Sequence, residues 1–408
     1  MTKLRQMSAA PPSNGALAAV LLTVFVNMMG LSIVFPLLPL WAQKFGAGPE
    51  DVGLLVSTFA VGQFAFAFVW GWVSDHWGRR PVILLALAGT VASFILMVFT
   101  ESLLWLFIAR AVAGAMGGSF GVAQAYVTDV TAPEKRARAM GWFAGAFSLG
   151  FILGPAIGGL LAGADAANPD FRSPFIAGAI ISGAALLLGL IFLREPVVHG
   201  EDELPHSFLG HMKSVVGAFG NRDVALPILL LTLLSFVLGG VEASFALWTD
   251  RQYQWGPREN GFLFAYIGVV LVIVQGLLVG RVTAWLGEKR LILAAGLAAA
   301  IGMALFPVAR DVWVMVVAAG LLAAGIGFAE PTLNAVLSHA VTAKQRGTVM
   351  GAAASSRGLG MVFGPTLAGL VFVAQGRHAP FVAGAIVLCL GTILVLRLKP
   401  RAMVSAES

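Results

Sequence analysis

The sequence has little charge. Only 11% of its 408 residues are Asp, Glu, Lys or Arg, whereas 58% are hydrophobic. Soluble domains contain about 25% charged residues, so neither a water-soluble fold nor a disordered chain fits this composition. The 26 basic residues outnumber the 20 acidic ones, but they form no dense stripe, and no nucleic-acid partner is expected. Most of the chain is therefore expected to lie in a lipid bilayer.

Cysteine and nucleotide-binding motifs are also scarce. Cys389 stands alone, which excludes an internal disulfide and a cysteine-rich metal site. His206 and His211 lie near an acidic run, but a solvated linker explains them better than a metal, so neither metal nor cofactor is predicted. None of the seven lysines follows a glycine, which excludes a phosphate-binding loop and ATP hydrolysis. With no catalytic constellation either, the chain is not expected to be an enzyme.

Long apolar runs dominate what remains. A membrane helix needs about 20 apolar residues. Such runs occupy residues 17–40, 52–72, 81–99, 104–126, 139–161, 174–193, 224–248, 260–282, 291–309, 312–340, 348–373 and 380–396. The sequence thus predicts an all-α membrane protein with twelve transmembrane helices. The first run is too long for a signal peptide and is interpreted as an uncleaved helix.

The basic residues predict the orientation. Loops on the side of both termini hold 18 of them, loops on the opposite side hold 6, and Arg110 and Arg357 lie within spans. Because basic loops stay in the cytoplasm, both termini are predicted to be cytoplasmic. We expect a monomer in the bacterial plasma (inner) membrane.

The chain divides into two similar halves. A polar stretch at 194–223 separates a six-helix bundle at 1–193 from a second at 224–408 and is interpreted as a cytoplasmic linker. Short motifs recur between the halves at offsets of 209 and 210 residues: Gly71–Arg80 with Gly280–Arg290, Arg136–Gly141 with Arg346–Gly351, and Gly154-Pro155 with Gly364-Pro365. Two pseudo-symmetric bundles with a site between repeats are typical of rocking transporters.

The loop after the second span predicts a cytoplasmic gate. It contains Gly71, Asp75, Gly78, Arg79 and Arg80. Asp75 is placed to oppose the positive end of a helix dipole, and the two arginines are placed to pair with Asp129 at the end of the fourth span. Alternatively, the loop only sets topology; an acidic residue does not contribute to orientation, which favours the gate.

The fifth span carries glycines at helical spacing around a proline, namely Gly150, Gly154, Pro155, Gly158 and Gly159. Small residues let helices approach closely, and proline bends a helix. Close packing alone explains this pattern, and an interface that rocks is the functional alternative.

These segments resemble the major facilitator superfamily. Gly71–Arg80 is similar to its signature between helices two and three, Arg110 with Gly114 to its helix-four motif, and Gly150–Gly159 to the helix-five motif of drug:proton exporters. Gly276–Arg290 is similar to the tetracycline-efflux branch of twelve-helix antiporters. The resemblance covers residues 17–396 and implies a small-molecule substrate and protons as partners.

The resemblance also implies a cavity lined by helices one, four, seven and ten. The positions that match are Asn27, Gln124, Glu242, Glu330 and Asn334, and Arg110, Phe245 and Arg357 are further candidates for the substrate cavity. Tetracycline exporters carry an aspartate where Asn27 stands, so a proton has to bind elsewhere in this chain. The aromatic Trp248 is interpreted as an anchor at the membrane interface.

Four ionisable residues fall inside predicted spans: Arg110, Glu242, Glu330 and Arg357. Each costs at least about 2.5 kcal/mol on insertion. Glu330 and Arg357 are predicted at matching depths and form a candidate ion pair, in a structural or gating role. Desolvation favours the protonated form of a carboxylate, so Glu242 is the first candidate for proton coupling and Glu330 the second. A glutamate at the outer mouth of the cavity is the alternative for Glu242.

The sequence therefore favours a secondary active transporter, a proton-coupled antiporter that exports small amphipathic molecules by alternating access. A lipid or glycolipid flippase and a metabolite importer on the same fold remain alternatives, and a non-transporting receptor is disfavoured because the loops are short.

Overall fold

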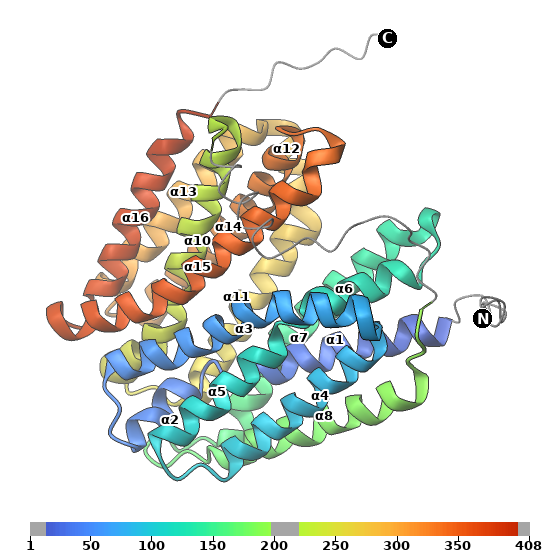
Figure 1. Ribbon diagram of the computed structural model, residues 1–408. Helices are drawn as coiled ribbons and strands as arrows, with labels where there is room; N and C mark the ends of the chain where they lie inside the picture. The colour runs from blue at the N-terminus through green and yellow to red at the C-terminus, as the bar shows by residue number, and fades with distance from the viewer. Residues whose placement is uncertain (1–13, 197–219, 399–408) are drawn as a thin grey trace, which may run out of the picture. The chain divides into compact units, whose positions relative to one another are not determined.

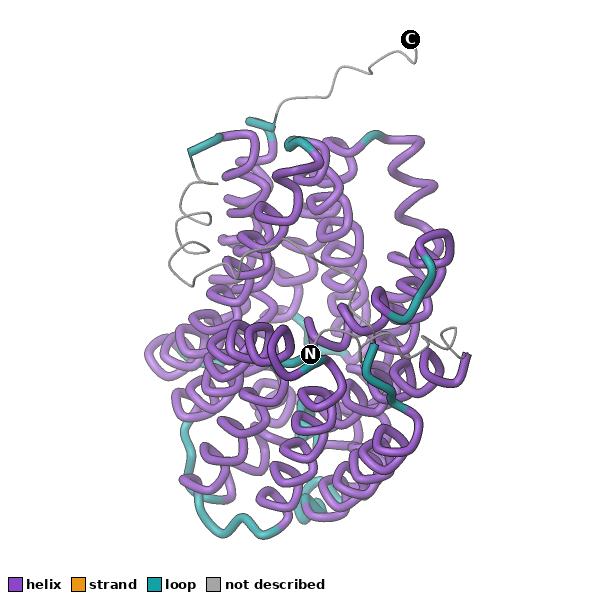
Figure 2. The backbone as a smooth tube through the Cα atoms, turned by 45° about the vertical axis from the view of Figure 1, so that its right-hand side comes forward, coloured by secondary structure: helices purple, strands orange, loops and turns teal. Residues whose placement is uncertain are grey.

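The computed structural model describes residues 14–196 and 220–398, where every regular element is a helix (Figure 2). The first half of the chain forms α1 (Asn14–Ile33), α2 (Leu38–Lys44), α3 (Pro49–Trp77), α4 (Arg79–Val98), α5 (Leu103–Gly117), α6 (Phe120–Asp129), α7 (Arg136–Ala162) and α8 (Arg172–Phe192). The second half forms α10 (Arg222–Tyr253), α11 (Pro257–Ile273), α12 (Val279–Leu286), α13 (Glu288–Leu305), α14 (Val312–His339), α15 (Ala343–Gln375) and α16 (Ala379–Val395).

These helices account for the predicted spans. Ten helical segments in the described residues are long and apolar enough to cross a bilayer. α1 and α2 together form another, bent by 43° next to Pro36, because proline has no amide hydrogen to continue a helix. α16, an apolar helix of 17 residues, completes the set. The prediction of an all-α membrane protein is confirmed, and the described helices are consistent with the twelve predicted spans.

Two predicted spans contain a break. The span at 104–126 consists of α5 and α6, which meet at Gly117 and Gly118, where the absence of side chains weakens a helix. The span at 260–282 contains a π-helical segment, Val274–Leu278, between α11 and α12. Each pair still forms one apolar segment long enough to span the bilayer.

The helices form two compact units. Of the described residues, 14–46, 58–196 and 254–265 belong to unit 1, and 47–57, 220–253 and 266–398 belong to unit 2. The first turns of α3 therefore belong to the unit built mainly from the second half, and the first turns of α11 belong to the other unit. The linker predicted at 194–223 lies largely outside the described residues.

Each unit has its own apolar core. In unit 1, α1 packs against α7 and α8, and α4 packs against α5 and α8, around buried residues such as Val20, Tyr126 and Phe143. In unit 2, α10 packs against α15, and α13 lies between α14 and α16 (Figure 1) around Ile228 and Leu337. The repeated sequence motifs are thus matched by repeated helix pairing.

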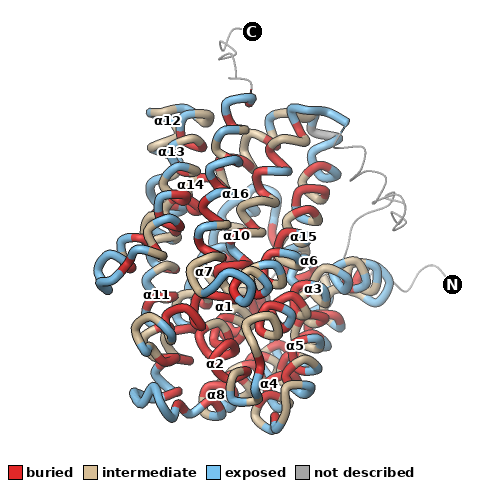
Figure 3. Tube along the Cα trace, turned by 90° about the vertical axis from the view of Figure 1, so that its left-hand side faces the viewer, coloured by how far each residue is buried: buried red, intermediate tan, exposed pale blue. Residues whose placement is uncertain are grey.

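The helices are also apolar on their outward faces. Along each helix, buried and exposed stretches alternate (Figure 3). The exposed stretches carry large apolar side chains, such as Leu104, Ile180 and Ile191, each more than 60% exposed. Apolar surface of this extent marks contact with a membrane, so the outward faces agree with lipid as the solvent.

Candidate functional site

Arg79 links the two ends of the predicted gate within unit 1. Its guanidinium donates to the Asp75 carboxylate at 2.8 Å and to the Asp129 carboxylate at 3.3 Å. It also donates to the Ser74 hydroxyl at 2.5 Å. Arg79 is the first residue of α4, so it ties this helix to the ends of α3 and α6. Arg79, rather than Arg80, makes the contact with Asp129 that the sequence predicts for the pair.

Glu195 is a member of this cluster that sequence reasoning missed. Its carboxylate accepts hydrogen bonds from the backbone amides of Arg79 at 2.6 Å and Arg80 at 3.0 Å. These amides are unpaired donors of the first turn of α4, where a negative charge also complements the helix dipole. Gly78, at φ 100°, provides the turn into α4. Glu195 lies 115 residues from Arg80, and no local pattern signals that contact.

Unit 2 contains a counterpart of this cluster, with a carboxylate in place of the arginine and a histidine in place of the aspartate. Glu288, 209 residues after Arg79, lies 3.3 Å from His339, which is 210 residues after Asp129. The helix-end contact is retained as well: Arg80 donates to the Leu190 carbonyl at 3.0 Å, and Lys289 donates to the Leu396 and Leu398 carbonyls at 2.8 and 2.6 Å. A cation at the C-terminal end of a helix is favourable, so both repeats keep this contact.

The glycines of α7 lie directly against α1 in unit 1. A Cβ atom added to Gly150 would lie 2.5 Å from the Phe25 carbonyl, and one added to Gly158 would lie 2.9 Å from the Ile33 carbonyl. The Ser32 hydroxyl donates to the Gly150 carbonyl at 3.0 Å. Gly154 meets the Met29 carbonyl in the same way. Close packing of backbones therefore accounts for the glycine spacing.

Each unit contains one segment from the other half of the chain, residues 254–265 in unit 1 and residues 47–57 in unit 2. These two exchanged segments make matching contacts in their units. In unit 1, Gly261 of α11 lies against the Pro155 carbonyl of α7, and a Cβ on Gly159 would lie 2.7 Å from the Pro257 carbonyl. In unit 2, Gly53 of α3 meets the Pro365 carbonyl of α15 in the same manner. The proline inside each long helix thus presents its carbonyl to a glycine of the exchanged segment.

A hydroxyl contact further fastens the segment exchanged into unit 2. The Ser57 hydroxyl donates to the Val362 carbonyl at 2.6 Å and lies 2.8 Å from the Thr366 hydroxyl. Both partners belong to α15 and flank the helix turn that contains Pro365. This end of α3 is therefore held by hydrogen bonds as well as by close backbone packing.

Glu330 and Arg357 form an ion pair inside the apolar spans of unit 2. The Arg357 guanidinium lies 2.5 Å from the Glu330 carboxylate, and the side chains are 37% and 31% exposed. Asn334, one turn after Glu330 on α14, is half-buried. The pair joins α14 to α15 and compensates both charges, since separating either from its partner in an apolar region is costly.

The other ionisable residues in the spans lie in different surroundings. Arg110 of α5 is fully buried, and its guanidinium carbon lies 4.4 Å from the centre of the Phe59 ring, a cation–π distance. Glu242 is half-buried in α10 and is followed by seven buried residues, 243–249. In unit 1, Asn27 is half-buried and Gln124 is exposed. Their place in a substrate cavity stays a prediction.

The far end of α10 is an aromatic cluster in unit 2. Trp248 is completely buried, with the rings of Phe245, Phe306 and Phe381 centred 5.2–5.9 Å away. The interpretation of Trp248 as an interfacial anchor is wrong, because other aromatic residues cover its ring. Phe245, predicted to line the cavity, is itself 1% exposed within this cluster.

A family model, the Major Facilitator Superfamily, matches residues 20–310 and 251–407. The chain belongs to this superfamily. The tetracycline resistance protein of class C from Escherichia coli is 31% identical over 366 residues, which cover 89% of this chain and 91% of that protein. Multidrug resistance protein 2 of Bacillus subtilis is 26% identical over 385 residues, 93% of this chain and 94% of that protein. The resemblance to tetracycline-efflux transporters is thereby confirmed.

Solved structures share the superfamily fold. A nucleoside transporter superimposes with a TM-score of 0.80 at 13% identity, covering 94% of this chain and 99% of that one. The human organic anion transporter MFSD10 superimposes with a TM-score of 0.69 at 24% identity, covering 95% and 100%. At such identities the similarity establishes the fold.

Membership of the major facilitator superfamily makes the chain a transporter of small molecules and not an enzyme. Together with the apolar helices, the bacterial relatives support a multi-pass protein of the bacterial inner membrane. The position of the termini stays a prediction, and so does the monomeric state. His206 and His211, the weak candidate for a metal patch, lie outside the described residues.

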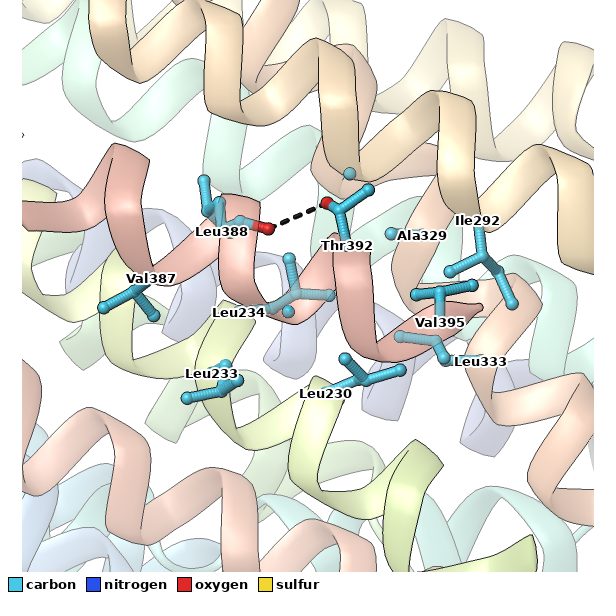
Figure 4. Close-up of a pocket in the computed structure, with 12 residues that line it drawn as sticks. Leu230, Leu233, Leu234, Ile292, Ala329, Leu333, Val387, Leu388, Thr392 and Val395 are labelled. Atoms are coloured by element: carbon cyan, nitrogen blue, oxygen red, sulfur yellow. Dashed lines mark hydrogen bonds between the residues drawn. The ribbon is translucent and has the colours of Figure 1, made fainter. Parts of the chain in front are cut away.

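One pocket of this superfamily member lies inside unit 2, between α10, α13, α14 and α16 (Figure 4). Its lining is apolar, and the Thr392 hydroxyl there is satisfied by the Leu388 carbonyl at 2.8 Å. Its volume is about 30 Å³, which matches one water molecule in the liquid and is far below the roughly 300 Å³ of a ligand pocket. This pocket is a packing void and not a substrate site.

Proposed function

We propose that this chain is a proton-coupled antiporter that exports small amphipathic molecules by alternating access. The observation that carries the proposal is Glu242, an acidic side chain 20 residues into α10 with seven buried residues directly after it. A carboxylate at such a position is costly, and in a transporter proton exchange is the simplest function for it. Membership of a transporter superfamily supports the same conclusion.

The ion pair of Glu330 and Arg357 complements Glu242 in this proposal. Arg357 lies 2.5 Å from the Glu330 carboxylate, so the pair joins α14 to α15. Glu330 is therefore assigned a gating role that holds α14 to α15, with proton binding as its secondary role. Asn334, Asn27, Gln124 and Arg110 are assigned to the substrate path on the basis of family resemblance.

Alternating access is supported by the way backbones meet at glycine. The helix pairs that touch through Gly150, Gly158 and Gly159 approach closely along their backbones, as small residues allow, and we assign a rocking movement to this interface. The Arg79 cluster, whose members are partly exposed, is assigned the role of a cytoplasmic gate that forms and breaks during transport.

The substrate class is inferred from the relatives. Proteins named for tetracycline resistance and for multidrug resistance are both similar to this chain. Asn27 replaces the aspartate that the tetracycline-efflux branch carries in helix one, so we propose amphipathic compounds other than tetracycline as the main substrates. A screen of drugs, lipids, sugars and metabolites for thermal stabilisation of the purified protein would identify them.

The coupling assignment is tested in proteoliposomes. Wild-type protein is expected to release protons from the lumen when a stabilising compound is added, and Glu242→Gln is expected to abolish this proton movement. Glu101→Gln is the matched control, because Glu101 is an exposed glutamate outside the helices. Unchanged proton movement in Glu242→Gln would remove Glu242 from the mechanism. Movement of a labelled lipid without a proton gradient would instead support a flippase.

A further inference from the structure

The loop between α15 and α16 contacts the end of α10 through a histidine. The indole nitrogen of Trp248 donates to Nδ1 of His378 at 3.2 Å. Trp248 is completely buried, while His378 is half-buried. The hydrogen bond therefore connects the core of unit 2 to a side chain that water can reach.

A second donor approaches the same imidazole from the other side. Nε of Arg377 donates to Nε2 of His378 at 3.2 Å, and Nη1 of Arg377 donates to the backbone carbonyl of Arg251 at 2.7 Å. Arg251 belongs to α10. The ring of His378 thus lies between two N–H groups, and Arg377 adds a second connection from the loop to α10.

The number of protons on the ring decides whether these contacts exist. A neutral imidazole has one nitrogen with a free lone pair, so it accepts one of the two donors, and the tautomer decides which. A protonated imidazole carries hydrogen on both nitrogens and accepts neither. It also places a positive charge beside the Arg377 guanidinium, which is repulsive.

We propose that His378 is a proton-sensitive lock on α10: the neutral ring with its lone pair on Nδ1 accepts from Trp248 and holds the helix, and the protonated ring releases it. Because α10 also carries Glu242, the lock links the proton concentration at this end of the protein to the mobility of a functional helix. The positive-inside rule predicts that this loop faces the outside of the cell. The proposal goes beyond the transport function and does not depend on it.

The surroundings of His378, its burial first and Arg377 second, favour the neutral ring. Burial, and next the neighbouring Arg377, lower the pKa of His378 from its usual value of 6.5. The other charged and titratable groups nearby are Asp250, Arg251 and Tyr253 at the end of α10 and Asp311 before α14, whose carbonyl lies 3.5 Å from the Tyr253 hydroxyl. Phe381 of α16 packs against the ring of Trp248, the donor to His378. Because the pKa of His378 is lowered in the folded protein, the neutral ring contributes its whole share to the free energy of unfolding above about pH 6.5. That contribution is lost as the pH falls through the lowered value.

Unit 1 has the same aromatic contact without the histidine. Trp41, 207 residues before Trp248, has its ring 4.9 Å from that of Phe175, which is 206 residues before Phe381. The residue 206 positions before His378 is Arg172, whose guanidinium has no acceptor for a tryptophan N–H. The lock is therefore a property of the second repeat alone.

The test is the pH dependence of thermal stability of the purified full-length protein, measured at pH 7.5 and pH 5.5. His378→Asn places an amide oxygen near the position of Nδ1, where it can accept from Trp248 at both values. Wild type is expected to lose about 2 °C more in Tm between the two values than His378→Asn, the size expected for one hydrogen bond. His76→Asn is the matched control, because His76 also contacts a tryptophan ring, that of Trp72, but is exposed.

Hydrogen exchange distinguishes the lock from a general effect of acid. Amides of residues 246–253, corrected for the intrinsic effect of pH, are expected to exchange faster at pH 5.5 in wild type and in His76→Asn but not in His378→Asn. Trp248→Phe, which removes the donor, is expected to show the fast exchange at both values. If His378→Asn keeps the full wild-type dependence in both measurements, or if Trp248→Phe exchanges slowly at pH 7.5, the proposal is wrong.

Discussion

At the residue scale, two glutamates that both lie within apolar membrane-spanning helices have different surroundings. Glu330 lies 2.5 Å from Arg357 and shares its charge with that partner. Glu242 lies in α10 ahead of a run of buried residues. The amino-acid type is the same, and we assign gating to Glu330 because of its ion pair and coupling to Glu242 because of its position 20 residues into the membrane-spanning helix α10.

The Glu330–Arg357 pair leads to a prediction about stability. Glu330→Gln and Arg357→Gln are each expected to lower the free energy of unfolding by about 1–3 kcal/mol, less than for a fully buried pair because both side chains are about one-third exposed. The exchanged pair, Glu330→Arg with Arg357→Glu, is expected to recover part of that loss. Thermal unfolding in detergent measures this; additive losses in the double variant would contradict a direct pair.

A second residue-scale prediction concerns Asp170, before α8. Burial alone would raise the pKa of Asp170, but hydrogen bonds from the Ser173 hydroxyl and from the amides of Ser173 and Arg172 lower it overall. A lowered carboxyl pKa gives stability that is present above about pH 4 and is lost as the pH falls through the lowered value. Asp170→Ala is expected to cost about 1 kcal/mol at pH 7 and to be neutral near pH 2. Equal losses at both pH values would contradict this capping role.

At the element scale, the position of each glycine against a neighbouring helix determines its effect. Gly364 of α15 lies against the Phe236 carbonyl of α10 with no room for a side chain. Gly391 of α16 faces the void in unit 2, where a Cβ atom would lie 3.6 Å from Leu230 and Leu233, an ordinary contact. The two glycines therefore differ in consequence although both are in apolar helices.

These glycines give opposite predictions for the same substitution. Gly391→Ala is expected to stabilise unit 2 by about 1 kcal/mol, through helix propensity and partial filling of the void. Gly364→Ala is expected to destabilise it by about 1–3 kcal/mol, because the backbones must separate. Tm values of the two variants against wild type decide the matter, and a Tm increase for Gly364→Ala would show that α10 and α15 have room to adjust.

At the scale of the whole molecule, the two repeats keep their contacts but vary their chemistry. Arg79 and Asp129 in unit 1 correspond to Glu288 and His339 in unit 2, where a carboxylate replaces the arginine and a histidine replaces the aspartate. The exchanged segments around Gly53 and Gly261 make matching contacts with Pro365 and Pro155. Geometry is thus conserved between the repeats more strictly than charge.

The orientation of the whole chain is open to a direct test. Green fluorescent protein fused after Ser408 is expected to fluoresce, because it folds only in the cytoplasm. Alkaline phosphatase fused after Arg377 is expected to be active, because this loop is predicted to be external. An inactive phosphatase after Arg377 together with a fusion after Ser408 that does not fluoresce would contradict the predicted orientation. His378 would then lie in the cytoplasm.

Much of the fold could be predicted because membrane segments are defined by local composition. The apolar spans and the short motifs such as Gly154-Pro155 depend on residues close together in the sequence. Partners far apart in sequence could not be predicted in the same way. Glu195 carries no motif, and Trp248 appeared interfacial because its position near a helix end says nothing about the rings that cover it.

The sequence by itself determined that this protein is embedded in a membrane, has twelve apolar segments and consists of two repeats. Hydrophobicity, charge and short motifs reveal these properties because each depends on residues close together in the sequence. Only the tertiary structure decided which charged side chains pair, which glycines contact a carbonyl and which segment of each half packs in the other unit. Those outcomes depend on long-range packing, in which the same side chain gains or loses a partner according to the helix that the chain brings beside it. His378 shows this best, because its two donors are a neighbour in sequence and a tryptophan 130 residues away.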